Sequence, residues 1–257
     1  MPDFDPSTPS IARVYDYLLD GKDNFAVDRE VAQKLLAAAP TAAAVMRENR
    51  QFLGRAVTWA AGQGITQFID LGCGMPTAPN THGSAQLVTA EPRVAYVDND
   101  AVVLAHLRAL AAHGNPGVTV IEGDVRETAV ILDAVRAGID LSQPACLLMG
   151  ALLHFFPAEA ARELAAGYVA ALAPGSYLVL SVGRADGDEA ERGFGAYSSG
   201  GVQAYNHSVA DFISFFGPLA LVAPGAVDAR VWDPAGRLTA PLPPRPGQSL
   251  VGVARVG

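Results

Sequence analysis

The sequence predicts an α/β fold in which a mostly parallel sheet is covered by helices on both faces. Roughly the first quarter of the 257 residues has helical periodicity and no strand. From residue 65 onward, short apolar stretches alternate with helical ones. Short apolar strands separated by helices are typical of a parallel sheet that is covered on both faces.

The composition is that of a globular protein. Hydrophobic residues make up 50% of the chain and charged residues 17%. Acidic residues outnumber basic ones by 26 to 18, and no long run of lysine and arginine occurs, so nucleic acid is not an expected partner. Cys73 and Cys146 lie in apolar stretches without a CxxC pair, and we expect two reduced, buried thiols.

The beginning of the chain, MPDFDPSTPS, has neither the basic nor the apolar region of a signal peptide. No apolar run approaches the roughly 20 residues that span a bilayer. We therefore expect a soluble, cytoplasmic protein without a membrane partner.

Three helices are expected before the first strand. One begins after Ser10, which can cap it, and ends at Gly21; the next ends at Pro40, and the third at Gly62 and Gly64. Residues 1–64 are therefore predicted to form a helical N-terminal cap, and residues 65–257 an α/β domain that is compact with it.

Strands and helices alternate through the rest of the chain. Strands are expected at 66–70, 93–98, 118–122, 145–149 and 176–182, and in the tail at 219–223, 227–232 and 250–256. Helices are expected at 84–89, 100–113, 127–137, 157–172 and 208–217. The segment 183–207 is rich in Gly, Ser and Asp, and is predicted to be a loop that shapes a pocket.

The ends of the first four predicted strands carry residues suited to one ligand, because ligands of open α/β sheets bind at the carboxyl ends of the strands. Glycines after the first strand let a ligand approach the backbone, an acid after the second can accept from ribose hydroxyls, and an acid with a following N–H can read an adenine edge. The residues are Asp70, Gly72, Cys73 and Gly74, then Asp98 and Asn99, then Gly123, Asp124 and Val125, then Gly150 and Ala151.

The first of these loops favours one class of adenosine compound. A dinucleotide fingerprint, G-x-G-x-x-G, would need glycine three residues after Gly74, where this chain has Thr77. The carboxylate of Asp70 would repel a pyrophosphate, whereas it would attract an ammonium or a sulfonium. These features predict S-adenosylmethionine as the cofactor.

Several longer segments resemble a known family. The sequence is similar to the largely actinobacterial S-adenosylmethionine-dependent methyltransferases with a type 19 methyltransferase domain. The matching segments are ARVYDYLLDGKDNFAVDRE, RENRQFLGRAV, QFIDLGCGMPTAPNTH, VAYVDND, HF, GSYLVLS and FFGPLALVAPG. The resemblance implies a Rossmann-like class I methyltransferase fold, with a mostly parallel seven-stranded sheet and a helical N-terminal extension.

The resemblance also implies positions for the parts of the cofactor. The loop from Asp70 to Gly74 would face the methionine part, Asp98 the ribose, and Asp124 with Val125 the adenine. Cys73 stands where the family commonly has threonine, so no catalytic role is expected of its thiol. Four residues of an extended loop before the next helix are further candidates for cofactor contact: Pro76, Thr77, Asn80 and His82.

The sequence indicates fewer candidate residues for binding the methyl acceptor. His154, just beyond the fourth strand, is the candidate general base, and a helix-capping role is its alternative. Tyr17 could belong to a lid over the cofactor, and Tyr205 and His207 could line the acceptor pocket or cap a helix. Tyr15 is expected in the core. The segment MRENR is expected to be a solvated helix face, and as an alternative Arg47 or Arg50 could bind a carboxylate of the acceptor.

We therefore expect a methyltransferase that acts on oxygen or nitrogen of a small molecule, in secondary metabolism. Two other classes stay open: a regulatory protein that binds S-adenosylmethionine without transferring methyl, and an NAD-dependent oxidoreductase. His82 has no second ligand at metal-binding spacing, so no metal is expected. A homodimer is compatible with the sequence.

Overall fold

A computed structural model describes residues 5–112, 114–199, 201–236 and 247–257, and these contain a sheet of eight strands. The order is β3-β2-β1-β4-β5-β8-β6, and the short β7 pairs with β8 outside this order. β1 to β5 are parallel, whereas β8 is antiparallel to β5, β6 and β7. The strands are β1 Gln67–Leu71, β2 Arg93–Asp98, β3 Val118–Glu122, β4 Cys146–Gly150, β5 Tyr177–Ala185, β6 Ala220–Leu221, β7 Val227–Asp228 and β8 Gly247–Arg255.

The expected mostly parallel α/β sheet is confirmed, with one short strand more than the seven implied. All five residues of β1 are buried, as an apolar strand covered on both faces should be. In the register of the sheet, Leu71 lies beside Val97, and Asp98 beside Glu122. This register brings the carboxyl ends of the first three strands to the same edge.

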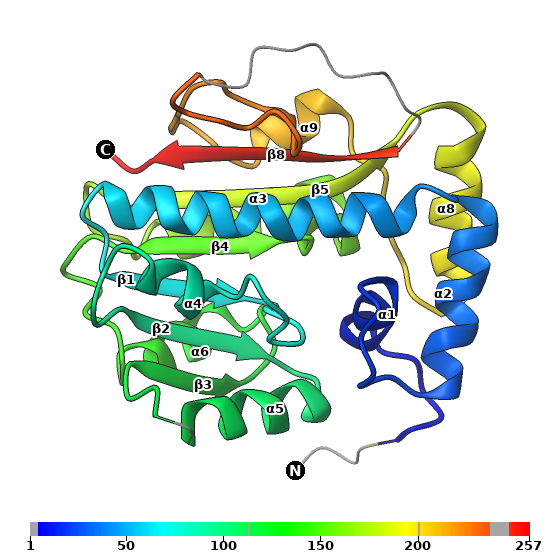
Figure 1. Ribbon diagram of the computed structural model, residues 1–257. Helices are drawn as coiled ribbons and strands as arrows, with labels where there is room; N and C mark the ends of the chain where they lie inside the picture. Colours follow the sequence, from blue (N-terminus) through cyan, green and yellow to red (C-terminus); the bar gives the residue numbers. More distant parts are fainter. Residues whose placement is uncertain (1–4, 113, 200, 237–246) are drawn as a thin grey trace.

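Helices cover both faces of the sheet (Figure 1). On one face, Phe52, Ala85 and Leu107 belong to an apolar cluster contributed by α3, α4 and α5; on the other, Ile131, Tyr168 and Phe212 represent α6, α7 and α9. These helices are α3 Ala42–Gly62, α4 Thr81–Gln86, α5 Ala101–Ala112, α6 Thr128–Val135, α7 Ala158–Val169 and α9 Val209–Ser214, and a 3-10 turn, η1, spans Leu153–Phe155.

A third group of helices lies beside the carboxyl ends of the parallel strands (Figure 1). It consists of α1 Ile11–Leu18, α2 Ala26–Ala38 and α8 Gly187–Ser199. Their apolar cluster includes Leu18, Leu35 and Tyr197, together with Met46 near the start of α3. We call α1, α2 and α8 the cap. It differs from the predicted N-terminal cap of residues 1–64, because it includes α8 and excludes α3, which lies on a face of the sheet. None of the described helices is long and apolar enough to cross a bilayer.

The prediction of a loop over residues 183–207 is wrong for most of that segment. β5 continues through Ala185, and α8 follows almost at once. Several glycines lower the helix propensity of this stretch. Burial overrides this weak preference, because Ala196 and Tyr197 pack into the cap cluster with α2.

Two of the three C-terminal strands are shorter than expected, whereas β8 begins three residues earlier than predicted. Of the predicted strands 219–223 and 227–232, only two residues each pair in the sheet. Trp232 instead leaves the sheet and packs edge-to-face on Phe52 of α3, with ring centroids 5.2 Å apart. The expected end of the helix at residue 113 lies outside the described residues.

Replacing Phe52 by alanine should destabilise the protein strongly. Its side chain is 0% exposed and contacts the ring of Trp232. Loss of such an aromatic side chain costs about 3–5 kcal/mol, because its burial is lost and a cavity remains. Urea denaturation followed by circular dichroism measures this change.

Val130→Ala on α6 is the matched control, because this side chain is 62% exposed. Its free energy of unfolding should change by less than about 0.5 kcal/mol. Equal losses for the two variants would contradict the role given to the packing of α3 against the C-terminal segment.

Candidate functional site

A cavity of about 850 Å³ opens at the carboxyl edge of the sheet, between the strand ends and the cap. This volume is near the upper end of the range of small-molecule sites. Eleven of the residues predicted from the strand ends line it: Asp70, Gly72, Cys73, Gly74, Asp98, Asn99, Gly123, Asp124, Val125, Gly150 and Ala151. The four predicted loops therefore meet in one place.

Asp98 connects two of these loops, those after β1 and β2, through its carboxylate. Its Oδ1 accepts from the backbone N–H groups of Asn99 and Asp100 at 2.9 and 3.0 Å, and its Oδ2 accepts from Gly74 N at 2.9 Å. Burial raises the pKa of Asp98, and these N–H donors oppose that rise. The thiol of Cys73 lies 3.9 Å from Oδ2, and a thiol is a weak donor that a ligand hydroxyl could replace at this oxygen.

Asp70 is held less tightly at the end of β1. Its Oδ2 accepts from the hydroxyl of Thr81 at 2.6 Å. Burial raises the pKa of Asp70 to about 6, although Thr81 and the positive charge of Arg50 lower it. A cation placed beside this carboxylate would stabilise its ionised form.

Asp124 lies at the other end of the cavity, after β3. Its carboxylate binds the guanidinium of Arg126, whose Nε lies 2.9 and 3.0 Å from the two oxygens. This hydrogen bonding lowers the pKa of Asp124. The side chain of Arg126 is largely exposed, so the pair lies at the rim of the cavity.

Four residues of the extended loop do not line the cavity: Pro76, Thr77, Asn80 and His82. The expectation that a helix begins only after His82 is wrong, because α4 begins at Thr81. Asn80 caps this helix by accepting from Gly83 N at 2.9 Å. The ring of His82 is buried against Tyr96, with 2.9 Å between its Nδ1 and the tyrosine hydroxyl.

The predicted base, His154, also lies outside the cavity lining. Its ring is buried in η1, and its Nδ1 accepts a long hydrogen bond of 3.4 Å from Gly183 N. Burial, with a smaller effect of His207, lowers the pKa of His154 to about 3. The ring is therefore neutral at pH 7 and joins η1 to β5, which does not support a role in taking a proton from an acceptor.

The three predicted acceptor residues are likewise absent from the lining: Tyr17, Tyr205 and His207. His207 is buried, with its Nε2 3.2 Å from the carbonyl oxygen of Leu153, and Tyr205 stacks on it. The backbone N–H of Tyr205 donates to the carbonyl of His154 at 2.7 Å. His207 and Tyr205 therefore contact the segment that carries the lining residues Leu152, Phe155 and Phe156, and they do not line the cavity themselves.

Known proteins match this chain over its whole length. A structure from Thermobifida fusca, provisionally assigned as a methyltransferase, is 36% identical, with 99% of this chain and 97% of that chain covered and a TM-score of 0.89. A DUF574 family protein from Streptomyces avermitilis is 33% identical, with coverages of 98% and 99% and a TM-score of 0.88. The S-adenosyl methyltransferase family model matches residues 1–257.

The chain belongs to the S-adenosyl methyltransferase family. It is an S-adenosylmethionine-dependent methyltransferase. An O-methyltransferase family protein from Burkholderia thailandensis, 14% identical with a TM-score of 0.53, shares the fold over 80% of this chain and 56% of that chain. No curated protein sequence matches the chain.

The residues around the cavity of this methyltransferase suit its cofactor. Gly72 and Gly74 adopt the left-handed φ values of 61° and 62°, which glycine reaches without strain. A Cβ on Gly74 would meet no atom within 4 Å, so the cavity reaches the backbone there. Buried carboxylates at the ends of β1 and β2 offer acceptors of the kind that an ammonium and a ribose hydroxyl would need.

The cap contributes a wall of the cavity that sequence reasoning largely missed. Tyr15, expected in the core, lines the cavity, and its hydroxyl donates to the Met46 carbonyl and accepts from Asn49. Helical periodicity places Tyr15 on an apolar face but does not distinguish a core from a cavity wall. The other lining residues come from the N-terminal part of the cap, from α3 and from the two segments after β4 and α8, and they include Ser10, Arg13, Asn49, Arg50, Leu53, Leu152, Phe155, Phe156, Val202 and Gln203.

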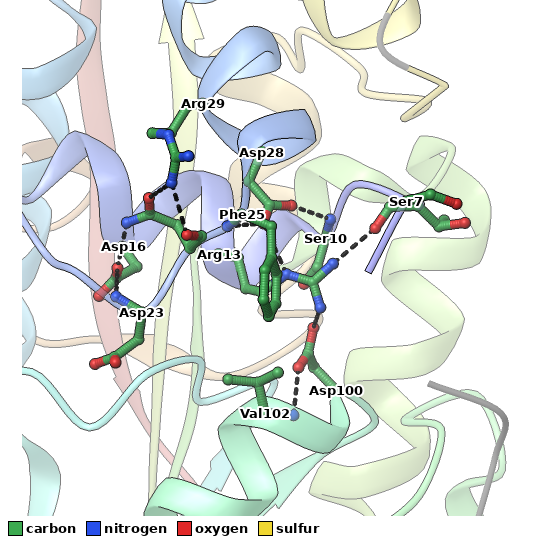
Figure 2. A network of polar contacts seen from close by, with 12 residues as sticks. Ser7, Ser10, Arg13, Asp16, Asp23, Phe25, Asp28, Arg29, Asp100 and Val102 are labelled. Carbon is green, nitrogen blue, oxygen red and sulfur yellow. Dashed lines mark hydrogen bonds and ion pairs between the residues drawn. The ribbon is translucent and has the colours of Figure 1, made fainter. Parts of the chain in front are cut away.

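Arg13 attaches the cap to the strand ends of the methyltransferase (Figure 2). Its Nε lies 2.9 Å from Asp28 of α2, and its Nη1 lies 3.2 Å from Asp100, which precedes α5. Asp100 also accepts from Val102 N at 2.8 Å and so caps α5. The guanidinium lies 5.0 Å from the ring centroid of Phe25, and it is buried.

The described residues contain no group of three or more His, Cys, Asp or Glu side chains that could hold a metal ion. Cys73 and Cys146 are free and buried. Burial raises the pKa of the Cys73 thiol well above its usual value. This thiol is therefore neutral and unsuited to act as a nucleophile at pH 7.

Arg13→Ala should destabilise the protein by about 3–5 kcal/mol, because it leaves the fully buried carboxylate of Asp28 without its cation. Arg47→Ala is the matched control: this arginine pairs with Asp20, but the two side chains are 47% and 80% exposed. Its loss should cost less than about 1 kcal/mol. Urea denaturation compares the two, and an equal effect would contradict the attachment of the cap through Arg13.

Proposed function

We propose that this methyltransferase binds S-adenosylmethionine along the carboxyl ends of β1 to β4 and transfers its methyl group to oxygen or nitrogen of a small molecule. One observation carries the proposal: the loops after four successive strands line a single cavity. S-adenosylmethionine supplies a methyl group activated by its sulfonium, so the protein chiefly has to hold the acceptor atom in line with that group.

The polar groups along the cavity support the order in which the cofactor lies. Asp70 would face the ammonium of the methionine part, and Asp98 a ribose hydroxyl. The three backbone donors on Asp98 fix its carboxylate, and a ribose hydroxyl would replace only the weak donation from the Cys73 thiol on Oδ2. Asp124 and Val125 would face the adenine. The carboxylate of Asp124 would then bind both Arg126 and the adenine ring.

The acceptor would lie against the apolar part of the lining. Leu152 is next to the glycine loop, since a Cβ on Gly72 would lie 2.8 Å from its Cδ1. Phe155 and Phe156 follow in the same segment, and Tyr15 and Gln203 add polar groups from the cap and from the chain after α8. Such a surface favours an acceptor of small size with an apolar or planar body.

The lining also bears on how the acceptor is activated. Among its described residues there is no histidine, lysine or glutamate, and the proposal assigns Asp70, Asp98 and Asp124 to the cofactor. We therefore infer that the acceptor atom is already nucleophilic at working pH, as the nitrogen of a weakly basic amine or the oxygen of a carboxylate or phenolate is. His154 then acts as a positioning residue, which fixes η1 against β5 behind the acceptor side.

Calorimetric titration with S-adenosylmethionine tests the location of the cofactor. The wild-type protein should bind S-adenosylmethionine and not NAD. Asp98→Ala should weaken binding about 10- to 100-fold, because a charge-assisted hydrogen bond to the ribose is lost. Thermal unfolding of the variant, followed by circular dichroism, checks that it is folded.

Asp133→Ala is the control, because its carboxylate is exposed on α6 and pairs with Arg136 away from the cavity. It should bind S-adenosylmethionine as the wild type does. If a folded Asp98→Ala protein also bound like the wild type, the proposed position of the ribose would be wrong.

The binding of S-adenosylmethionine should weaken at acid pH. The pKa of Asp70 is about 6 in the free protein, and a bound ammonium would lower it. Binding therefore favours the ionised carboxylate, and a proton must leave Asp70 when the pH is below 6. Between pH 7 and pH 5 we expect the dissociation constant to rise about tenfold.

Asp70→Asn provides the comparison. It should bind more weakly than the wild type at pH 7, and its dissociation constant should vary much less between pH 5 and 7. If the variant kept the full pH dependence of the wild type, another group would be responsible and Asp70 would not face the ammonium.

A further inference from the structure

Arg50 projects from α3 toward the start of the glycine loop. Its Nη2 donates to the carbonyl oxygen of Met75 at 2.5 Å, directly after Gly74. Arg50 and Asp70 both line the cavity, and the charge of Arg50 acts on the Asp70 carboxylate. A cation and an anion therefore lie near one another at the methionine end of the cavity.

Arg50 differs from the other arginines of the lining in its partners. Arg13 is bound to Asp28 and Asp100, and Arg126 is bound to Asp124. Among the described residues, Arg50 has no carboxylate within the 4.0 Å of an ion pair, and its buried Nε has no hydrogen-bond partner. Buried donors are nearly always paired, so this Nε points to a ligand that supplies an acceptor.

We propose that Arg50 binds the α-carboxylate of the cofactor, so that Arg50 and Asp70 together recognise the two charges of its amino acid part. This inference rests on the proposed position of S-adenosylmethionine. The α-ammonium and α-carboxylate are attached to the same carbon, so the groups that bind them must be neighbours. Arg50 meets this requirement beside Asp70.

The chemistry of the guanidinium fits a carboxylate. Arginine presents its Nε and an Nη as a planar fork that matches two carboxylate oxygens. The bond from Nη2 to Met75 O fixes the guanidinium against the glycine loop. The free Nε is then oriented before any ligand arrives, so little side-chain entropy is lost on binding.

The consequence is selectivity among adenosine thioethers. S-adenosylhomocysteine carries the amino acid part, whereas 5′-methylthioadenosine has the same adenosine and sulfur without it. Wild-type protein should bind S-adenosylhomocysteine at least about 100-fold more tightly than 5′-methylthioadenosine, since two charged contacts are lost with the latter.

Calorimetric titration of Arg50→Gln, Arg50→Lys and Arg47→Gln with both compounds tests the inference. Arg50→Gln should weaken binding of S-adenosylhomocysteine about 10- to 100-fold and leave 5′-methylthioadenosine unchanged. Arg50→Lys should recover part of this loss, because it keeps the charge but not the fork. Arg47→Gln, three residues earlier on α3 but exposed, should bind both as the wild type does.

Two results would overturn the inference. Equal weakening of both compounds in Arg50→Gln would mean that the residue only shapes the cavity. Unchanged binding of S-adenosylhomocysteine in that variant would assign Arg50 to another ligand, such as a carboxylate on the acceptor. Failure of the wild-type protein to bind S-adenosylhomocysteine at all would instead reject the proposed cofactor position on which the inference rests.

Discussion

The ion pairs of Arg13 are the contact on which the rest of the site depends. They join α2 of the cap to the residue that begins α5, and both the guanidinium and Asp28 are shielded from solvent. Without the cap, the strand ends would form an open ledge rather than a cavity. A buried charge that has lost its partner is strongly destabilising. This contact therefore favours the observed position of the cap over positions in which Arg13 and its carboxylates are separated.

Asp98 has a comparable role within the sheet. Its carboxylate accepts backbone N–H groups from the glycine loop and from the turn into α5, so the ends of β1 and β2 are fixed relative to each other. Asp100, two residues later, caps α5 and receives Arg13. A short run of acidic residues thus organises both the floor and the side wall of the cavity.

The residues that the sequence correctly places together in one cavity are those fixed by strand order. Asp70 and Asp98 lie near the ends of apolar strands and Asp124 shortly after one, and parallel strands bring such residues to one edge whatever the helices do. The helical side of the cavity, formed by α1 of the cap and by α3, follows no comparable rule. Tyr15 and Arg50 lie on helices whose periodicity shows one buried face but not what that face meets.

Local sequence patterns do not predict the structure at two other places. Glycines in residues 187–199 argue against a helix, and packing against α2 stabilises one there. His154 follows a strand end as a base would, yet the turn of η1 directs its ring away from the cavity. In both cases the decisive contacts come from residues far along the chain, which a local pattern does not contain.

The cap is assembled from two distant parts of the chain, since α8 follows β5 and packs on α2. It is therefore not an autonomous module. A fragment ending near residue 64 would leave the side of α2 that includes Leu35 without its partners Ala196 and Tyr197. During synthesis, the cap can close only after the five parallel strands have been made, so the cavity is completed late in folding.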